Sequence, residues 1–381
     1  MATVISEEYM KTNGYISTWK RIVLKIGSAL IAPDGKGCSS HNLLAIAQFI
    51  IECRKRHIDV ILVSSGSVAA GRAFFAEAKP SIGLKKAMAA AGQAEMLATW
   101  DRLFDFPTAQ VLLTHGDLTD KERYDSIKET ISTLLENGLL PIINENDTVT
   151  TDYLKVGDND NLSAMVAAAT HADVLIMCSD IEGLFTKDPN KYDDAVIVKT
   201  VNEIDENIKS MAGCATSSVG TGGMATKLEA AEKAAAHGIY SYIVNGFNQS
   251  VFTDFLSDKN PGTLFAPYAK PLDQDIHWLT HTTREQGELV LNKEGADAFI
   301  LGDTALSTDD VVEVNGNFSN GDTVIIKDSE GEELAKASTN YSSCLLSYIA
   351  DISDKSSSNS VSSVLQEDNI AMLNEASEDG R

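Results

Sequence analysis

The sequence predicts an α/β protein in which a three-layer α/β/α sandwich with a mainly parallel central sheet is followed by a small β-rich domain. Residues 20–245 alternate short β-rich runs with longer helical stretches, and this order produces right-handed βαβ units. Several runs are apolar throughout rather than alternating, as expected for parallel strands that are buried on both faces. After about residue 260 the runs become short and are punctuated by Gly and Pro.

The strands expected in the first domain are short and mostly apolar. They are Arg21–Ile26, Asp59–Val63, Thr108–Leu113, Leu140–Ile143, Asp173–Cys178 and Tyr240–Val244. The longer stretches between them are expected to be helices: Asn42–Lys55, Lys85–Phe104, Lys121–Glu136, Leu162–Thr170 and Met224–Ala236. In open α/β sheets, ligands bind beyond the carboxyl ends of the strands, so the loops at those ends are the first candidates for a site.

A second domain is expected from about residue 285. Its candidate strands are Glu288–Leu291, Val311–Val314 and Asp322–Lys327, and its candidate tight turns are Asn315-Gly316 and Asn320-Gly321. The predicted boundaries are an N-terminal extension over residues 1–17, a first domain over 18–268, a second domain over 285–365 and an acidic tail over 366–381.

The charge of the chain is strongly acidic and unevenly distributed. The formal net charge is −24, and residues 271–381 hold 22 Asp and Glu but only 6 Lys and Arg. Such a segment repels a phosphate backbone, so RNA binding by the second domain is not expected. Solubility is the simpler explanation of the acidity.

The sequence indicates neither a membrane span nor a secreted protein. No apolar run reaches the roughly 18 residues that cross a bilayer. Residues 1–20 lack the basic-then-apolar order of a secretory signal. The five cysteines are scattered, odd in number and without metal-ligand spacing, which favours a reduced, cytoplasmic compartment and no protein-bound metal.

The first loop with candidate chemistry is Leu24-Lys25-Ile26-Gly27-Ser28. It places a lysine at a strand end, next to backbone N–H groups, and this combination suits a phosphate. A solvated lysine before a turn is the more frequent meaning of so short a motif.

The second loop is the small-residue stretch from Val63 to Gly71, which contains Ser65-Gly66-Ser67. Small residues between a strand and a helix start allow a ligand to approach the backbone closely, and the helix start favours an anion. Tight packing of the helix on its neighbours is an equally good explanation of the same residues.

The third loop runs from Gly220 to Lys227, with three glycines before a helix. The spacing is not that of a Walker A motif, and a flexible glycine-rich loop is the alternative. Lys227 argues for an anion nearby, because a cation in the first turn of a helix opposes the helix dipole.

Residues 144–161 form the most polar stretch of the first domain, with Asn144-Glu145-Asn146-Asp147-Thr148 and Lys155-Val156-Gly157-Asp158-Asn159-Asp160-Asn161. Carboxylates and amides here are suited to hold an ammonium group and to orient lysines. Part of the stretch is similar to a calcium loop, but it lacks the alternate spacing and the terminal Glu of an EF-hand. A plain turn-rich loop leaves these charges unexplained.

Taken together, these motifs resemble the amino-acid kinase superfamily, over Arg21 to about Pro267. The most specific of them are the strings Lys155–Ala164 and Gly220–Lys227 in this order. The C-terminal segment resembles a PUA domain, on Gly287-Glu288-Leu289 and Gly316-Asn317-Phe318-Ser319. Within the superfamily, the resemblance points to the members that transfer the γ-phosphoryl of ATP to the side-chain carboxylate of L-glutamate, the first step of proline biosynthesis.

The resemblance also implies roles for particular residues. The catalytic residues would be Lys25, Lys227 and Asp160, the last of which would hold the two lysines. The residues at glutamate would be Ser65, Gly66, Asp147 and Asn159. Those at the nucleotide would be Lys25, Gly27, Ser28, Ser179, Asp180, Thr221, Gly222, Gly223, Met224, Ala225, Thr226 and Lys227. Gly27, Ser28 and Gly66 would act through backbone N–H groups, and Ser179 stands where the family usually has Thr.

The same resemblance implies Mg²⁺ bound with ATP, a homo-oligomer (dimer or tetramer), and a transient hand-off of the labile acyl phosphate to glutamyl phosphate reductase. Two alternatives remain open at this point. One is another kinase of the superfamily, acting on acetylglutamate, aspartate or uridylate. The other is an RNA-binding protein that acts through the PUA-like domain, which the acidic charge there disfavours.

Overall fold

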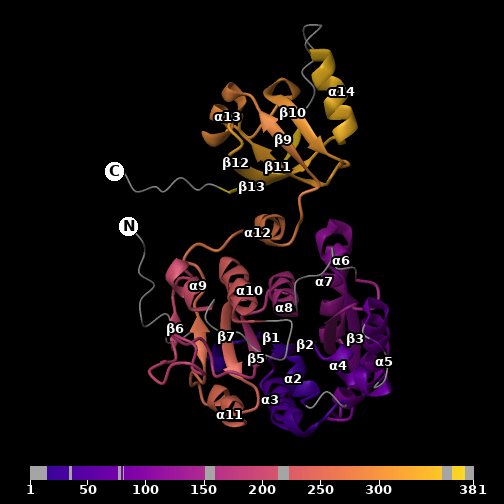
Figure 1. Ribbon diagram of the computed structural model, residues 1–381, viewed down its shortest axis with the longest axis vertical. Helices are drawn as coiled ribbons and strands as arrows, with labels where there is room; N and C mark the ends of the chain where they lie inside the picture. Colours follow the sequence, from indigo (N-terminus) through magenta and orange to yellow (C-terminus); the bar gives the residue numbers. More distant parts are fainter. Residues whose placement is uncertain are drawn as a thin grey trace. The chain divides into compact units, whose positions relative to one another are not determined.

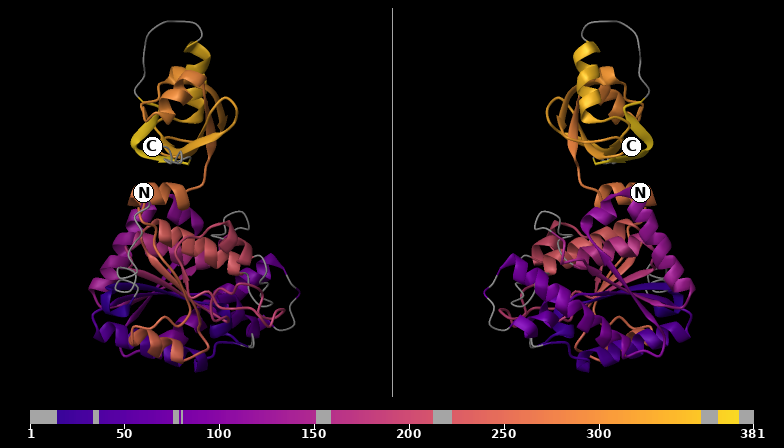
Figure 2. Two further views of the ribbon diagram at one scale, coloured as in Figure 1. Left: turned by 90° about the vertical axis from the view of Figure 1, so that its left-hand side faces the viewer. Right: turned by 90° about the vertical axis from the view of Figure 1, so that its right-hand side faces the viewer.

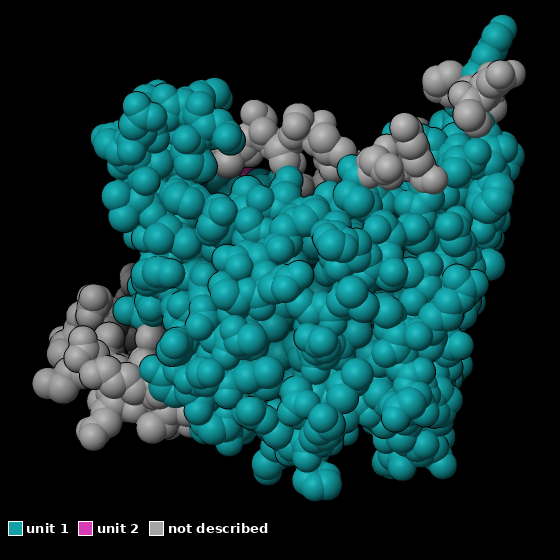
Figure 3. Space-filling view, turned by 90° about the horizontal axis from the view of Figure 1, so that it is seen from below, with its two compact units in different colours: residues 1–272 teal, residues 273–381 magenta. Residues whose placement is uncertain are grey.

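The computed structural model describes residues 15–33, 37–75, 79, 81–150, 159–212, 223–353 and 363–373. The chain divides into two compact units, Met1–Leu272 and Asp273–Arg381, which are drawn in Figure 1 and from two sides in Figure 2. Figure 3 shows one face of the first unit as a surface of closely packed atoms. No helix in the described part of the chain is long and apolar enough to cross a bilayer.

The first unit is built on a mainly parallel sheet with the strand order β3-β4-β2-β1-β5-β7-β8-β6. The strands are β1 (Arg21–Ile26), β2 (Asp59–Ser64), β3 (Thr108–Leu113), β4 (Leu140–Glu145), β5 (Val174–Ser179), β6 (Thr200–Val201), β7 (Tyr240–Asn245) and β8 (Thr263–Phe265). Only the β7–β8 pairing is antiparallel among these strands. The predicted fold class is confirmed, and all six predicted strands are present: two have the predicted bounds and the other four differ by one or two residues at one or both ends.

Helices cover both faces of this sheet (Figure 1). The helices of the first unit are α2 (Ser28–Ile31), α3 (Leu44–Lys55), α4 (Ser67–Gly71), α5 (Ile82–Asp101), α6 (His115–Thr119), α7 (Lys121–Glu136), α8 (Asn159–Ala169), α9 (Glu206–Ala212), α10 (Met224–Ala236) and α11 (Ser250–Leu256). Short 3-10 helices lie at Ile16–Thr18, His41–Leu43 and Arg72–Phe75. The α3 and α11 helices lie on one face, and α8 and α10 lie on the other.

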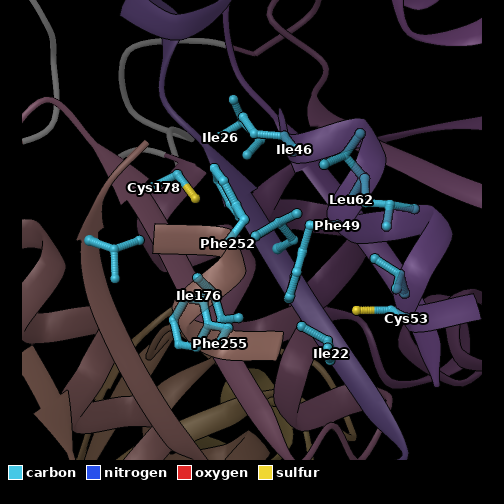
Figure 4. Packing of buried hydrophobic residues seen from close by; sticks show 14 of the residues in the cluster. Ile22, Ile26, Ile46, Phe49, Cys53, Leu62, Ile176, Cys178, Phe252 and Phe255 are labelled. Atoms are coloured by element: carbon cyan, nitrogen blue, oxygen red, sulfur yellow. The ribbon is translucent and has the colours of Figure 1, made fainter. Parts of the chain in front are cut away.

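The core on the α3 face shows why a short helix that the sequence analysis missed is stable. Phe252 and Phe255 of α11 pack against Phe49 of α3, with ring centroids 5.6 and 6.0 Å apart (Figure 4). These rings belong to the same buried cluster as Ile22 and Ile176 of the central strands (Figure 4). A seven-residue segment gives little helical periodicity in the sequence, so tertiary packing rather than local propensity maintains it.

One helix boundary matters for the site. The sequence predicts a helix from Leu162, but α8 begins at Asn159. The polar residues before Leu162 are typical of a loop, but acidic and amide side chains are also common in the first turn of a helix. Asn159 and Asp160 are therefore held by helical backbone directly beyond the strand ends.

The second unit contains a separate sheet with the order β10-β9-β11-β12-β13. Its strands are β9 (Gly287–Leu291), β10 (Val311–Gly316), β11 (Thr323–Lys327), β12 (Glu333–Thr339) and β13 (Leu365–Met372). The three predicted strands are present, but three helices were missed: α12 (Gln274–His281), α13 (Lys293–Ile300) and α14 (Ser343–Ser353). A 3-10 helix spans Thr308–Asp310.

The predicted acidic tail over residues 366–381 is corrected by β13, which pairs with β12 in antiparallel register. Ala371 lies opposite Lys336 and is buried. The strand was missed because Gln366-Glu367-Asp368-Asn369 gives it a polar centre, which is typical of a strand at the edge of a sheet.

Candidate active site

The candidate residues meet at the carboxyl ends of the central parallel strands. In the register of the sheet, Ile26 at the end of β1 pairs with Ser64 at the end of β2, and Val63 pairs with Ile143 near the end of β4. The helix α8 starts beside these ends, and α10 packs along α8 (Figure 1). Residues that are far apart in the sequence are thus brought to one edge of the sheet, as predicted for this class of fold.

Two lysines share one carboxylate in this region. Lys25 Nζ lies 2.5 Å from Asp160 Oδ1, and Lys227 Nζ lies 3.1 Å from Asp160 Oδ2. All three side chains are buried, with 6%, 4% and 0% of Lys25, Lys227 and Asp160 exposed. The structure therefore brings together the three residues that the sequence analysis proposed as catalytic.

The local structure explains this arrangement. Lys25 lies on β1 among apolar residues, and strand periodicity turns it to the face covered by α8, opposite to Leu24 and Ile26. Asp160 is in the first turn of α8, where a carboxylate is favoured by the helix dipole. Lys227 is in the first turn of α10, where a cation opposes the helix dipole, and the carboxylate of Asp160 is the nearby anion that the sequence analysis expected.

The hydroxyl of Thr226 also contacts Asp160. Thr226 Oγ1 lies 3.1 Å from Asp160 Oδ2 and 2.9 Å from the Gly223 carbonyl oxygen. Burial alone would raise the pKa of Asp160, but the charges of Lys25 and Lys227 outweigh it and lower the pKa to about 2. Asp160 is therefore ionised at neutral pH.

The charges of this trio do not cancel. Two ammonium groups and one carboxylate leave one excess positive charge among buried side chains. A buried charge is costly unless it is paired. The arrangement is thus suited to bind an anion, and the ammonium groups of lysine are well suited to phosphate oxygens.

A second cluster, of amides and hydroxyls, lies beside the trio. Asn159 Nδ2 donates to Ser65 Oγ at 2.8 Å and to Asn144 Oδ1 at 3.0 Å. Ser67 Oγ donates to Asp147 Oδ2 at 3.1 Å. The structure therefore links three of the residues proposed to bind glutamate, Ser65, Asp147 and Asn159, through Asn144 and Ser67.

Gly66 is required by the backbone in this cluster. Its φ is +110°, in the left-handed region, and a Cβ placed there would lie 2.8 Å from the Cβ of Ile31. Both observations exclude larger residues at this turn between β2 and α4.

One predicted role needs correction. The Gly27 N–H was expected to be available to a phosphate, but it donates to the Cys178 carbonyl oxygen at 3.2 Å. Continued pairing of the chain with β5 takes up this donor, which a sequence cannot reveal. Ser28 begins the short helix α2 directly afterwards.

The proposed nucleotide residues are only partly brought together. Ser179 ends β5 and its Oγ donates to Asp180 Oδ1 at 3.0 Å. Within the described residues, no hydrogen bond or ion pair links Ser179 or Asp180 to the two lysines. Gly223 precedes α10, Met224 is buried and Ala225 is exposed. Thr221 and Gly222 lie outside the described residues.

The calcium-loop interpretation rests on Asp158, Asn159 and Asp160. Asp158 is outside the described residues, and both oxygens of Asp160 face lysines. Across the part of the chain that the structure describes, no group of three or more His, Cys, Asp or Glu side chains could hold a metal ion.

Sequence reasoning did not identify two of the residues in the cluster as site residues, although both lie in motifs that it singled out. Ser67 and Asn144 bridge the proposed ligands of glutamate. Gln93, on α5, was missed entirely, because a single glutamine within a helical stretch gives no signal.

A buried excess of positive charge at the carboxyl ends of parallel strands, beside an amide and hydroxyl cluster, is the arrangement of an α/β phosphotransferase. The chain belongs to the amino acid kinase family, whose model matches residues 20–245. A PUA domain model matches residues 287–356. The resemblance inferred from the motifs is confirmed.

Proteins that are similar to this chain over most of its length make the family assignment more specific. Glutamate 5-kinase 1 of Pseudoalteromonas translucida (strain TAC 125) is 58% identical over 361 residues, which cover 93% of this chain and 98% of the relative. Glutamate 5-kinase of Idiomarina loihiensis is 47% identical, covering 94% of this chain and 99% of the relative. Glutamate 5-kinase of Salinibacter ruber is 45% identical, covering 85% and 88%.

Proposed function

We propose that this chain phosphorylates the side-chain carboxylate of L-glutamate with ATP and forms L-glutamyl 5-phosphate, the first step of proline biosynthesis. The observation that carries the proposal is the buried trio of Lys25, Asp160 and Lys227, with its excess positive charge beside the amide and hydroxyl cluster. The named relatives at 58% and 47% identity support the choice of substrate.

Phosphoryl transfer to a carboxylate depends more on electrostatic stabilisation than on proton transfer. A carboxylate acceptor is already ionised at pH 7, so no general base is required. The protein must align two anions and neutralise the charge on the transferring phosphoryl group. In our proposal Lys25 contacts the transferring phosphoryl group, Lys227 stabilises the leaving phosphates, and Asp160 fixes the position of both ammonium groups.

The acceptor would be bound by the amide and hydroxyl cluster. We assign Ser65, Gly66 and Asn159 to the carboxylate end and Asp147 to the ammonium group of glutamate. The basis is that a carboxylate is the natural partner of an ammonium group, while hydroxyl, amide and backbone N–H donors suit a carboxylate.

The donor would lie at the start of α10 and the end of β5. Ser28, Ser179, Asp180 and the segment from Thr221 to Lys227 are assigned to the nucleotide. Mg²⁺ would be held by the phosphates of ATP with few direct protein ligands. The carboxylate of Asp160 is committed to the lysines, which agrees with a metal carried by the nucleotide.

The direct test is release of ADP by the full-length chain with Mg²⁺, ATP and L-glutamate, together with trapping of the acyl phosphate as a hydroxamate. Acetylglutamate, aspartate and uridylate serve as competing acceptors. Turnover of L-glutamate well above the others is expected, and turnover of another acceptor alone would refute the proposal.

Further assignments follow from the same proposal. We place the kinase domain at residues 18–268 and the PUA-like domain from residue 285 to the end of β13 at Met372. We also infer a homo-oligomer that passes its labile product to glutamyl phosphate reductase. A cytoplasmic location is supported by the free thiols of Cys38, Cys53, Cys178 and Cys344, none of which is in a disulfide.

Replacing Asp147 with Ala is expected to act on glutamate binding. The ammonium group of glutamate changes little during phosphoryl transfer. Losing its partner therefore weakens the binding of substrate and transition state equally. We expect KM for glutamate to rise by about tenfold or more, while kcat stays within about threefold. Steady-state kinetics at saturating ATP measure both constants. A normal KM with a greatly reduced kcat would move Asp147 into the catalytic group.

A chain that ends at Leu272 is expected to retain kinase activity. The first unit has its own core, and Leu272 N donates to the Ala236 carbonyl oxygen at 2.8 Å, so the cut preserves this contact. All the proposed catalytic and binding residues lie before residue 228. The measurement is kcat and both KM values, beside circular dichroism to verify folding. A folded but inactive truncated chain would show that the second unit takes part in catalysis.

A further inference from the structure

Gln93 on α5 is a buried polar residue to which the proposed reaction assigns no role. Only 9% of it is exposed. Its Oε1 accepts a hydrogen bond of 2.9 Å from Asn144 Nδ2. A buried amide within a helix is costly unless it forms specific hydrogen bonds, so the contact with Asn144 calls for an explanation.

The packing of two helices brings Gln93 to this position. A Cβ on Gly92 would lie 1.9 Å from the Ser67 carbonyl oxygen, and a Cβ on Gly71 would lie 1.9 Å from the Met88 carbonyl oxygen. The backbones of α4 and α5 therefore touch without intervening side chains. This close approach lets a residue next to Gly92 reach the cluster around Ser67.

The hydrogen bonds of the cluster have a fixed direction. The backbone N–H of Glu145 donates to Asn159 Oδ1 at 3.3 Å, and a backbone N–H is never an acceptor. Asn159 must therefore direct its Nδ2 toward Ser65 Oγ and Asn144 Oδ1.

Asn144 continues the same direction. Because its Oδ1 accepts from Asn159, its Nδ2 is turned toward Ser67 Oγ at 3.3 Å and Gln93 Oε1 at 2.9 Å. The Ser67 hydroxyl accepts from Asn144, so its single hydrogen is directed to Asp147 Oδ2. Gln93 supplies the acceptor at which this branch of the chain of amides ends.

We propose that Gln93 is a positioning residue for the glutamate end of the site: it holds the Asn144 amide in the orientation that presents Asn159, Ser65 and Asp147 to the substrate. Without an acceptor at position 93, one hydrogen of Asn144 Nδ2 is buried without a partner, and the amide rotates away from Asn159 and Ser67. The lysines contact a different residue, Asp160, so the nucleotide end is unaffected. This inference rests on the proposed function.

The test compares two replacements at one position. Gln93→Met removes the acceptor and keeps the volume, and Gln93→Glu keeps an oxygen acceptor whether or not it is ionised. For Gln93→Met we expect KM for glutamate to rise by about tenfold, with KM for ATP and kcat within about threefold. For Gln93→Glu we expect KM for glutamate to return toward the wild-type value.

The control is Thr99→Val on the same helix, at an equally buried site where Oγ1 donates to the Glu95 carbonyl oxygen of α5 itself. It is expected to leave KM for glutamate unchanged. A wild-type KM in Gln93→Met, an equal change in all constants, or no improvement in Gln93→Glu would overturn the inference alone. A wild-type chain without activity on glutamate would overturn the proposed function, and this inference with it.

Discussion

Lys227→Ala is expected to lower kcat by about 10²-fold or more while changing KM for glutamate little, because in the proposed mechanism its ammonium group neutralises charge that develops on the leaving phosphates. The side chain is 5% exposed, so water cannot replace it readily. Lys25→Ala is expected to have an effect of the same order, since both lysines face one carboxylate. Steady-state rates of ADP release with saturating substrates measure the loss.

A matched control separates this role from a general loss of positive charge. Lys209 of α9 pairs with Glu206 and Glu232, 3.8 and 3.1 Å away, and 43% of its side chain is exposed. Lys209→Ala is expected to retain full turnover, because exposed ion pairs contribute little. Near-normal kcat in Lys227→Ala or in Lys25→Ala would refute the roles proposed for these lysines.

Asp160→Ala is expected to impair both stability and turnover. It leaves two buried ammonium groups without their shared carboxylate, and breaking a buried ion pair in this way costs about 3–5 kcal/mol of unfolding free energy. Turnover falls because neither lysine keeps its position. Urea unfolding and steady-state kinetics on the same preparation measure the two effects.

The double variant Asp160→Ala/Lys227→Ala makes this prediction specific. Removing one of the two stranded lysines should restore part of the lost stability, although it cannot restore turnover. If the double variant is less stable than Asp160→Ala by the full cost of the lysine replacement alone, the trio is not electrostatically coupled.

The same carboxylate predicts a dependence of stability on pH. The pKa of Asp160 is lowered from 3.8 to about 2 in the folded chain, so the folded state favours the ionised form. The stabilisation is complete above about pH 4 and is lost as the pH falls toward 2. The difference in stability between the wild-type chain and Asp160→Asn should therefore shrink over this range, as measured by urea unfolding at a series of pH values.

The sheet of the first unit could be predicted from the sequence because its strands are buried on both faces and are apolar without interruption. Ile22, Leu24 and Ile26 of β1 are almost fully buried, and only Lys25 interrupts them. Lys25 could be proposed as catalytic for the same reason, since a lysine within an apolar strand is conspicuous in the sequence. Asp160 was identified through a family motif rather than through its surroundings.

Other features depend on contacts that a linear pattern does not contain. The α11 helix is held by Phe252 and Phe255 against α3, and β13 by its pairing with β12. The engagement of the Gly27 N–H with Cys178 and the link from Gln93 to Asn144 both join segments at least 50 residues apart. Their significance appears only when the strands and helices are assembled.

In the proposed site, the first turn of α8 sets the distance between the residues assigned to the acceptor and those assigned to the donor. Asn159 reaches the acceptor cluster, Asp160 holds the lysines, and Asn161 Oδ1 accepts from Lys233 of α10 at 2.9 Å. Consecutive residues of a helix are separated by a rise of 1.5 Å and a fixed rotation. One rigid helical turn therefore fixes the spacing between the residues assigned to the phosphoryl donor and those assigned to the acceptor. In our proposal, a sequence change that rotates this turn to accommodate a longer acceptor would also displace the lysines, so a change of acceptor made through this turn would lower kcat as well.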